Sequence, residues 1–325
     1  QRPPTGLATL MKITGLSNKR EFDAQDIGFN IGPRLNAAGR LGQAPLGVEL
    51  LVTDDPGRAQ ELAEYLDNLN NDRKKIERSI NLAAAKQIKE KYNIETDPAF
   101  VLAGHGWNAG VIGVVSGRLA EKFGRPVILI ALDQMGVKPG IGSARNGGIG
   151  NLHEALQHCT EHLMKHGGHA AAAGLTIEES QIDGFRSAFC EYIQESVSDE
   201  DRIVEVVIDA EAPLSQLTAQ TIVQMQQLGP FGEANPAPVL CASNVEVVKG
   251  TAKRMGGGER HLSVKVAQYG TTLRAVAFGQ GDWAEELDQV PGQIDVVFKP
   301  VINEFRGQRN VELHLEDWRA VSESA

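Results

Sequence analysis

The feature that most constrains the fold is a stripe of apolar residues with helical spacing in the first third of the chain. Its members recur four and three positions apart, interrupted at Arg73, which places them on one face of an α-helix. They are Leu62, Leu66, Leu69, Ile76, Ile80 and Ala83. Asp54 or Asp55 is suited to cap this helix, and Pro56 suits its first turn. We predict a helix over 56–92, about 50 Å long at 1.5 Å per residue.

The other faces of this helix are charged, with acidic and basic residues throughout 72–78. A helix of this length and charge commonly bridges two bodies, and a surface helix packed along a single domain is the alternative. The 325 residues of the chain suit two domains joined by such a connector.

Beyond Pro98 the pattern is that of an α/β domain. An apolar run, a Gly-rich turn, a helical segment and a second apolar run follow one another, which is typical of a βαβ unit and predicts a partly parallel, mixed sheet. The strands are expected at 99–103, 126–132 and 172–177, and the helices at 111–123, 152–164 and 182–197. The acidic stretch 198–201 is the expected linker to the next domain.

After residue 202 the sequence has the texture of an all-β domain. Short strands are expected at 204–208, 245–248, 261–266, 273–278, 294–301 and 311–315. The segment 230–238 is rich in proline and interrupts this pattern, and 256–258 is a run of three glycines. Five or six short strands in about 120 residues favour a small closed β-barrel of the oligonucleotide-binding kind, with a small sandwich as the competing interpretation.

Composition narrows the class of protein. The net charge of −10 counts against indiscriminate nucleic-acid binding, so phosphate contacts have to come from a local patch. Cys159, Cys190 and Cys241 lack CxxC spacing and fit a reduced, cytoplasmic protein. No apolar run is long enough for a membrane span, and no membrane partner is expected. The chain opens on Gln1 and reads as a fragment of a longer protein.

Two blocks have residues that suit phosphate binding. In 165–174, Gly167 and Gly168 let a ligand approach the backbone, and His169 could donate to a phosphate oxygen. In 33–40, Arg34 and Arg40 flank Asn36, and guanidinium groups suit paired phosphate contacts. A Gly turn before a small-residue strand, and two surface arginines in a loop, are the plain alternatives.

Other segments give weaker signals. A Gly-rich turn at 104–110 opens a predicted helix and is an anion site in principle, and 143–148 ends a predicted strand in a similar way. His158, His162 and His166 recur every four residues and could share a helical face that holds a metal. The alternative is a face of solvated or hydrogen-bonded histidines. No nucleophile motif or Asp-rich cluster indicates a hydrolytic centre.

The last domain has a local excess of basic residues. The candidates for contacting a nucleic-acid backbone on the barrel are Lys253, Arg254, Arg260, Lys265 and Arg274. Tyr269, Phe278 and Phe305 are the available aromatic stacking partners, and a solvated basic loop is the alternative.

Four of these segments, taken in order, resemble the RecJ-type single-strand-specific exonucleases of the DHH phosphoesterase superfamily. They are GPRLNAAGRLG at 32–42, GWNAGVIGVVSGRLAEKF at 106–123, GGHAAAAGLTI at 167–177 and LGPFGEANPAPVL at 228–240. The resemblance implies that 1–55 is the tail of the catalytic domain and 56–95 the connecting helix. Residues 96–200 would then be the DHH-associated domain, and 201–325 an oligonucleotide-binding barrel.

The resemblance also implies an activity and a division of labour. The family cleaves single-stranded DNA in the 5′→3′ direction with two manganese or magnesium ions, and the ligands of those ions would lie outside this chain. What carries over is substrate binding, by Arg34, Asn36 and Arg40 beside the metal site and by Ser143, Arg145, Gly168 and His169 in the associated domain. Single-strand-binding protein and recombination helicases are the implied protein partners.

Two other functions stay open at this point. One is a non-catalytic module that binds single strands, and the other is a short-oligonucleotide phosphodiesterase of the same superfamily, against which the large C-terminal β region argues. Because the metal ligands would lie outside it, we expect the chain alone to be inactive as a nuclease.

Overall fold

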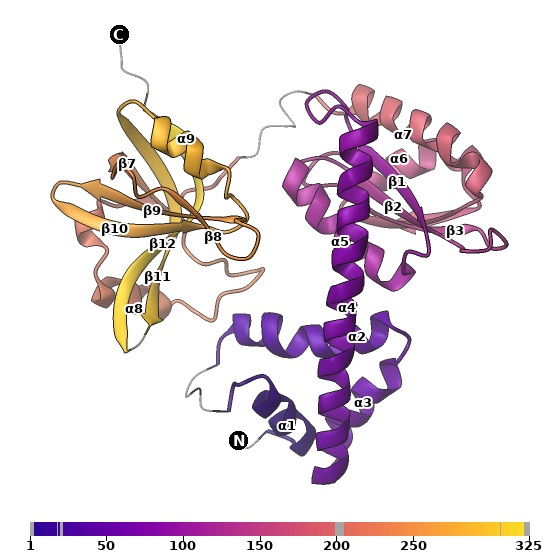
Figure 1. The fold of residues 1–325 in the computed structure, drawn as a ribbon, viewed down its shortest axis with the longest axis horizontal. Helices are drawn as coiled ribbons and strands as arrows, with labels where there is room; N and C mark the ends of the chain where they lie inside the picture. The colour runs from indigo at the N-terminus through magenta and orange to yellow at the C-terminus, as the bar shows by residue number, and fades with distance from the viewer. Residues whose placement is uncertain (1–2, 18, 20–21, 199–204, 306, 322–325) are drawn as a thin grey trace. The chain divides into compact units, whose positions relative to one another are not determined.

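The chain divides into two units, Gln1–Glu205 and Val206–Ala325. A computed structural model describes residues 3–17, 19, 22–198, 205–305 and 307–321. Figure 1 shows helices at the beginning of the first unit, a sheet covered by helices in its remainder, and strands as the main content of the second unit. Among the described residues, no helix is both long enough and apolar enough to cross a membrane.

Short helices pack around the first half of a long one in the N-terminal part. They are α1 (Thr5–Ile13), the π-helix η1 (Asp26–Ile31), α2 (Gly32–Arg40) and α3 (Ala44–Val52), and the long helix is α4 (Pro56–Lys91). Their shared core includes Leu10, Leu50 and Leu66, all fully buried. This core sets the position of α2. That helix carries the block at 33–40 with Arg34, Asn36 and Arg40, which we call the first basic block.

The long helix was predicted correctly. The side chain of Asp55 accepts hydrogen bonds from the amides of Gly57 and Arg58, and Pro56 occupies the first turn. The helix has 36 residues, about 54 Å at 1.5 Å per residue. Its first half packs in the N-terminal core, whereas Ile80, Ala84 and Ile88 pack under the sheet that follows. One helix therefore joins two bodies within the first unit, as Figure 1 shows.

The sheet of the first unit has the strand order β1-β2-β3-β5-β4. Its strands are β1 (Phe100–His105), β2 (Val127–Leu132), β3 (Gly140–Arg145), β4 (Lys165–Gly168) and β5 (Ala172–Ile177). The first two strands are parallel and are joined through α5 (Ala109–Phe123), and the other neighbours are antiparallel. This is the predicted βαβ unit within a mixed sheet.

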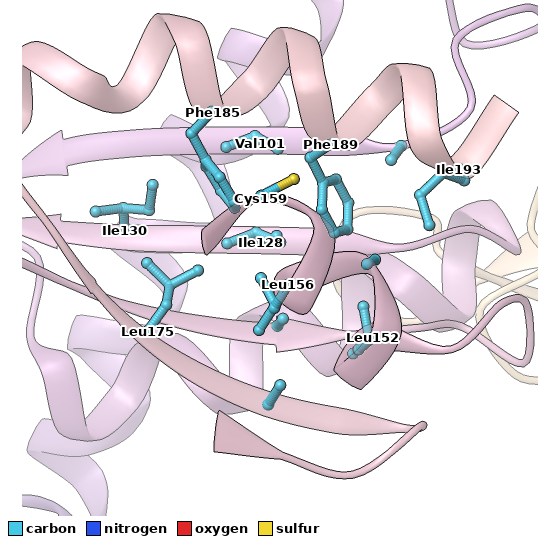
Figure 2. Packing of buried hydrophobic residues seen from close by; sticks show 14 of the residues in the cluster. Val101, Ile128, Ile130, Leu152, Leu156, Cys159, Leu175, Phe185, Phe189 and Ile193 are labelled. Carbon is cyan, nitrogen blue, oxygen red and sulfur yellow. The ribbon is translucent and has the colours of Figure 1, made fainter. Parts of the chain in front are cut away.

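Each face of the sheet has its own core. On one face α4 and α5 bury Phe100, Leu102 and Leu129. On the other lie α6 (Leu152–His158) and α7 (Ile182–Ser196). Figure 2 shows Phe185, Phe189 and Ile193 of α7 pointing toward the strands. Because side chains alternate along a strand, the residues between the core positions of β3 and β5 face the α5 side.

One predicted helix is too long. The helix expected over 152–164 ends at His158, and a single 3₁₀ turn, η2 (Thr160–His162), leads into β4. The hydroxyl of Thr160 donates to the Gln157 carbonyl and closes the helix end. Residues 165–168 then pair with β5 as an edge strand that the sequence analysis did not predict.

The second unit contains a closed ring of five strands. They are β7 (Leu240–Val247), β9 (His261–Gln268), β10 (Thr271–Ala277), β11 (Gln293–Phe305) and β12 (Gln308–Ala320). The ring runs β7-β11-β12-β10-β9 and closes where β9 pairs with β7. Only the β10–β12 pairing within this ring is parallel. The barrel interpretation is confirmed and the sandwich is excluded.

Smaller elements complete this unit. They are β6 (Ala210–Glu211), α8 (Ala219–Gln226), β8 (Lys253–Met255) and α9 (Trp283–Gln289). The strand expected at 204–208 is wrong for its described residues, since 205–208 form no ladder and β6 starts at Ala210. Residue 204 and most of the predicted linker 198–201 lie outside the described residues.

Candidate nucleic-acid interface

The end of α2 touches the start of α5. Nη1 of Arg40 donates to the carbonyl of Gly110 at 3.2 Å. A Cβ on Gly110 would lie 2.0 Å from the carbonyl oxygen of Arg40, so no larger residue fits without separating the two helices. The first basic block is thus fixed against the α/β domain, because Gly110 permits the approach.

Ser143 and Arg145 lie on the α5 side of β3. Ala144 between them belongs to the core on the opposite face. Nη1 of Arg145 donates to the hydroxyl of Ser143 at 3.2 Å and to the carbonyl of Ala144 at 2.7 Å. A Cβ on Gly113 of α5 would lie 3.3 Å from Nη2 of Arg145. Since Ser143 accepts from Arg145, its own hydroxyl proton is available to a ligand.

The electrostatics of Arg40 and Arg145 indicate an anion site. Burial lowers the pKa of Arg40, and the nearby Arg73 guanidinium lowers it further. Burial also lowers the pKa of Arg145, and there the second cause is Arg40. Two partly desolvated cations that repel each other are stabilised when an anion binds between them. We call Arg40, Ser143 and Arg145 the phosphate site.

The open part of the sheet beside this site has a floor of small residues. Ser143 pairs with Gly174 on β5, and Gly174 pairs with Gly167 on β4. Arg145 pairs with Ala172 in the neighbouring row. Gly167 and Gly174 are exposed, and the atom nearest to a Cβ on Gly174 would be 3.8 Å away. We call Gly167, Ala172 and Gly174 the glycine floor; a nucleotide strand can approach its backbone closely.

Gly168 and His169 turn the chain at the end of this floor. Gly168 has φ of +148°, and a Cβ there would lie 2.4 Å from the carbonyl oxygen of Ala172. The amide of His169 donates to that same carbonyl at 2.8 Å, and its side chain is exposed. His169 therefore lies one strand beyond Ala172, in the row that contains Arg145, whereas Gly168 pairs with Ala173 in the neighbouring row of Ala144.

The two other residues of the first block have different surroundings. Nε of Arg34 donates to Asp67 of α4 at 2.9 Å, and Nη1 donates to the carbonyl of Asn30 at 2.8 Å. Asn36 is exposed and lines, with Arg40, an open hollow between α2 and α3. The structure therefore joins Arg40 to the phosphate site, whereas Arg34 is held in an ion pair on another side of α2.

The glycine-rich turn at 104–110 has local structural reasons for its glycines. A Cβ on Gly104 would overlap the Trp107 ring. Asn108 caps α5, with its side chain accepting from the Gly110 amide and its carbonyl accepting from Val111. These amides of the helix N-terminus are already bonded, so the anion prediction for this turn gains no support from them.

The three histidines do not share a helical face, because α6 ends before His162. His158 stacks near Tyr192, His162 contacts Gln181, and the hydroxyl of Thr160 lies 3.2 Å from Nε2 of His166. Among the described residues, no three His, Cys, Asp or Glu side chains come together to hold a metal ion.

On the barrel, three predicted cations share one outer face. Lys265 pairs with Arg274 across β9 and β10, and Lys253 on β8 pairs with Ser263, two residues before Lys265. The alternate residues of β9, such as Val264, fill the barrel core. Arg274 also donates to Ser263 and to the buried Glu312 of β12. Lys253 and Lys265 are exposed on this face.

The same face has an aromatic cluster. Phe278 is 60% exposed and lies edge-on to His261 and His314, with ring centroids 5.5 and 5.1 Å apart. Phe278 was among the predicted stacking residues, whereas the two histidines were missed. We call Lys253, Lys265, Arg274, His261, Phe278 and His314 the barrel face.

The remaining predicted barrel residues have other surroundings. Arg254 pairs with Asp282 and Glu285 at the start of α9, and Nε of Arg260 donates to the Gly257 carbonyl. Tyr269 is exposed in the β9–β10 turn. The side chain of Phe305 lies outside the described residues.

Two family models match this chain. The DHHA1 domain model matches residues 96–195, and the RecJ OB domain model matches residues 208–317. The single-stranded-DNA-specific exonuclease RecJ of Bacillus subtilis is 33% identical over 321 residues, which cover 98% of this chain and 39% of that protein. The corresponding protein of Escherichia coli is 32% identical over 96% of this chain and 54% of its own length.

The chain belongs to the RecJ family. A crystal structure of Thermus thermophilus RecJ in complex with Mg²⁺ matches 98% of this chain and 47% of its own, at a TM-score of 0.79 and 29% identity. The chain thus spans about half the length of the RecJ proteins that it matches. Its mixed-sheet domain is a DHHA1 domain and its barrel is a RecJ OB domain.

Sequence reasoning missed one group near Arg40. Arg73 of α4 is close enough to Arg40 to lower the pKa of Arg40. Its interruption of the apolar stripe was the available signal, since a charged residue on a core-facing position is buried only with partners.

Proposed function

We propose that this chain binds single-stranded DNA for a metal-dependent exonuclease that hydrolyses phosphodiester bonds in the 5′→3′ direction during DNA repair and recombination. Its relatives are named single-stranded-DNA-specific exonucleases. The chain's own contribution in this proposal is to hold the strand, and the hydrolytic step belongs to residues outside it. Residues 1–55 would complete the catalytic domain, with 56–95 as connector, 96–200 as the associated domain and 201–325 as the barrel.

The observation that carries this proposal is the meeting of Arg40 and Arg145 beside the glycine floor. Arg40 donates to the Gly110 carbonyl at the start of α5, and Arg145 lies against Gly113 of the same helix, so two partly desolvated guanidinium groups from distant parts of the chain converge on α5. Desolvated guanidinium groups bind phosphate oxygens more strongly than solvated ones do. The floor next to them admits a backbone rather than a bulky side chain, which suits a thin, unpaired strand.

The proposed roles of the residues follow from their positions. Arg145 and Arg40 neutralise a phosphate, and the hydroxyl of Ser143 donates to one of its oxygens. Gly167, Gly168 and His169 border the adjacent stretch of strand. Arg34 and Asn36 would act beside the metal ions, which is a proposal that requires Arg34 to exchange Asp67 for phosphate. Manganese or magnesium would activate water for attack when bound in the whole protein.

The barrel face is proposed to bind another part of the DNA strand. Cations beside an exposed aromatic cluster combine backbone attraction with base stacking, which is how strands are held without sequence preference. Arg254 and Arg260 would contribute only general positive charge, because Arg254 is paired with two carboxylates and Arg260 donates to a loop carbonyl. Single-strand-binding protein and recombination helicases are the proposed partners, and the cytoplasm is the proposed location.

The test is a fluorescence anisotropy titration of a labelled single-stranded oligonucleotide with this chain, repeated at rising salt. We expect salt-sensitive binding that prefers single strands to duplex. In the same samples, with manganese added, we expect no degradation of the DNA. Absence of binding at low salt would overturn the proposal, and turnover that survives rigorous purification would refute the expected inactivity.

A further inference from the structure

A buried polar cluster lies on α4, which packs against both α2 and α5, the helices beside the phosphate site. Its members Asn70, Arg73 and Glu77 follow one another at helical spacing and are 0%, 8% and 5% exposed. A buried ion pair gives little net stability, because desolvation offsets much of the attraction between the charges. Apolar residues would attach α4 to its neighbours equally well, so the cluster needs another explanation.

The contacts of Arg73 fix its guanidinium group in one orientation. Nε and Nη2 donate to Oδ1 of Asn70 at 3.2 and 3.0 Å, and Nη1 donates to one carboxylate oxygen of Glu77. The other oxygen of Glu77 accepts from Arg118 on α5. Glu77 therefore orients Arg73 and links α4 to the helix that lies against Arg145.

This cluster has more hydrogen-bond donors than the acceptors of its members satisfy. Both Arg73 and Arg118 donate to the carboxylate of Glu77. Nδ2 of Asn70 is buried without a hydrogen-bond partner. The series of cations continues from Arg73 to Arg40 and from Arg40 to Arg145, each acting on the next. A phosphate beside Arg40 would relieve this repulsion.

We propose that Arg73 is a positioning residue of the phosphate site: oriented by Asn70 and Glu77, it sets a fixed positive charge behind Arg40 and strengthens phosphate binding without touching the strand. A charge in partly desolvated surroundings acts at distances where a surface charge is screened. This inference rests on the proposed function, since it assumes that Arg40 and Arg145 bind a DNA phosphate.

The first test removes the charge of Arg73 without changing the net charge of the protein. In the double variant Arg73→Gln/Glu77→Gln, two amides retain hydrogen-bonding groups at both positions. The matched control is Lys86→Gln/Glu90→Gln, an exposed ion pair on the same helix. We expect the first variant to bind the labelled single strand about three- to tenfold more weakly than the control does. Equal affinities of the two variants would overturn the inference.

A second pair of variants remains decisive if the double variant does not fold, which thermal unfolding will show. Asn70→Asp keeps acceptors for Arg73 and adds a negative charge beside it. Asn71→Asp adds the same charge at the next, exposed position. We expect Asn70→Asp to weaken single-strand binding at least about threefold relative to Asn71→Asp, because only the buried charge cancels that of Arg73. Equal binding would again contradict the proposal.

Two further measurements separate this inference from the function on which it rests. The slope of log affinity against log salt should fall by about one in Arg145→Gln, which loses a phosphate contact, and should stay unchanged in the Arg73 variant. If Arg145→Gln weakens binding and the Arg73 variant does not, the role of Arg73 is wrong and the phosphate site stands. If Arg145→Gln has no effect either, the phosphate site itself is wrong.

Discussion

The phosphate site and the barrel face are proposed to bind single-stranded DNA in two different ways. In the phosphate site, Arg40 and Arg145 are partly buried; burial lowers the pKa of both guanidinium groups, and Arg40 lowers the pKa of Arg145 further. On the barrel face, Lys253 and Lys265 are exposed, and the distinguishing feature is the cluster around Phe278. The phosphate site thus has a few charged groups in fixed positions, whereas the barrel face has cations and aromatic rings on a solvated surface.

This difference indicates what each region contributes. Buried guanidinium groups hold one phosphate at one place, which suits register relative to a cleavage point. A solvated surface with stacking groups accepts any base at many positions and adds affinity. Single substitutions in the phosphate site should therefore lower single-strand affinity strongly. Single substitutions on the barrel face should lower it only a little, and their effects should add up.

The largest effect is expected for Arg145→Gln. A hydrogen bond to a charged group contributes about 1.5–3 kcal/mol, so single-strand affinity should fall about tenfold or more. Anisotropy titrations measure this, with Lys89→Gln as the control because it removes one exposed positive charge from the end of α4. A similar loss in both variants would mean that net charge, and not the buried site, determines binding.

The next largest is expected for Gly174→Val, which fills the glycine floor. A β-branched residue is favourable in a strand and this position is exposed, so the thermal midpoint should hardly change. The side chain would occupy the space next to Ser143, and single-strand affinity should fall by about 1–2 kcal/mol through the displaced backbone contact. Unchanged binding in a folded variant would show that the strand does not cross this floor.

A moderate effect is expected for Phe278→Ala on the barrel face. Base stacking on an aromatic ring contributes about 1–3 kcal/mol, and we expect the lower end because Phe278 is partly engaged by two histidine rings. The salt dependence should not change, since no charge is lost. Tyr269→Ala, in the exposed β9–β10 turn, is the control and should bind as the wild type does.

The smallest effect is expected for Lys265→Gln. An exposed cation loses one screened contact, so affinity should fall by less than about 1 kcal/mol, and the salt slope should decrease. If Lys265→Gln lowered single-strand affinity as much as Arg145→Gln does, the contrast between a fixed phosphate site and a solvated barrel face would be wrong.

Much of the fold could be predicted from local patterns. Asp55, Pro56 and a regular apolar stripe predict the long helix. Alternating apolar runs and glycine turns predict the βαβ unit. The errors lie where tertiary pairing decides. The segment 165–168 becomes a strand because β5 offers it a partner, and β8 has three residues, too few for a periodic signal.

The candidate site was less predictable for a related reason. Motifs pointed to Arg40, Ser143 and Arg145, and the structure brings these together. The contact between Arg40 and Gly110 joins residues 70 positions apart, and no local pattern contains that information. The aromatic cluster was missed because His261 and His314 meet Phe278 only after β10 and β12 pair in parallel.

The continuity of α4 has a consequence for how such a protein can vary. Arg34 is attached to Asp67 in the first half of the helix, whereas Arg118 is attached to Glu77 farther along it. Each inserted residue turns one end of a helix by about 100° relative to the other and lengthens it by about 1.5 Å. One added residue between Asp67 and Glu77 would therefore move Arg40 out of phase with Arg145. The length of the helix therefore fixes the position of Arg40 relative to Arg145. Its central segment should tolerate substitutions of side chains far better than insertions or deletions.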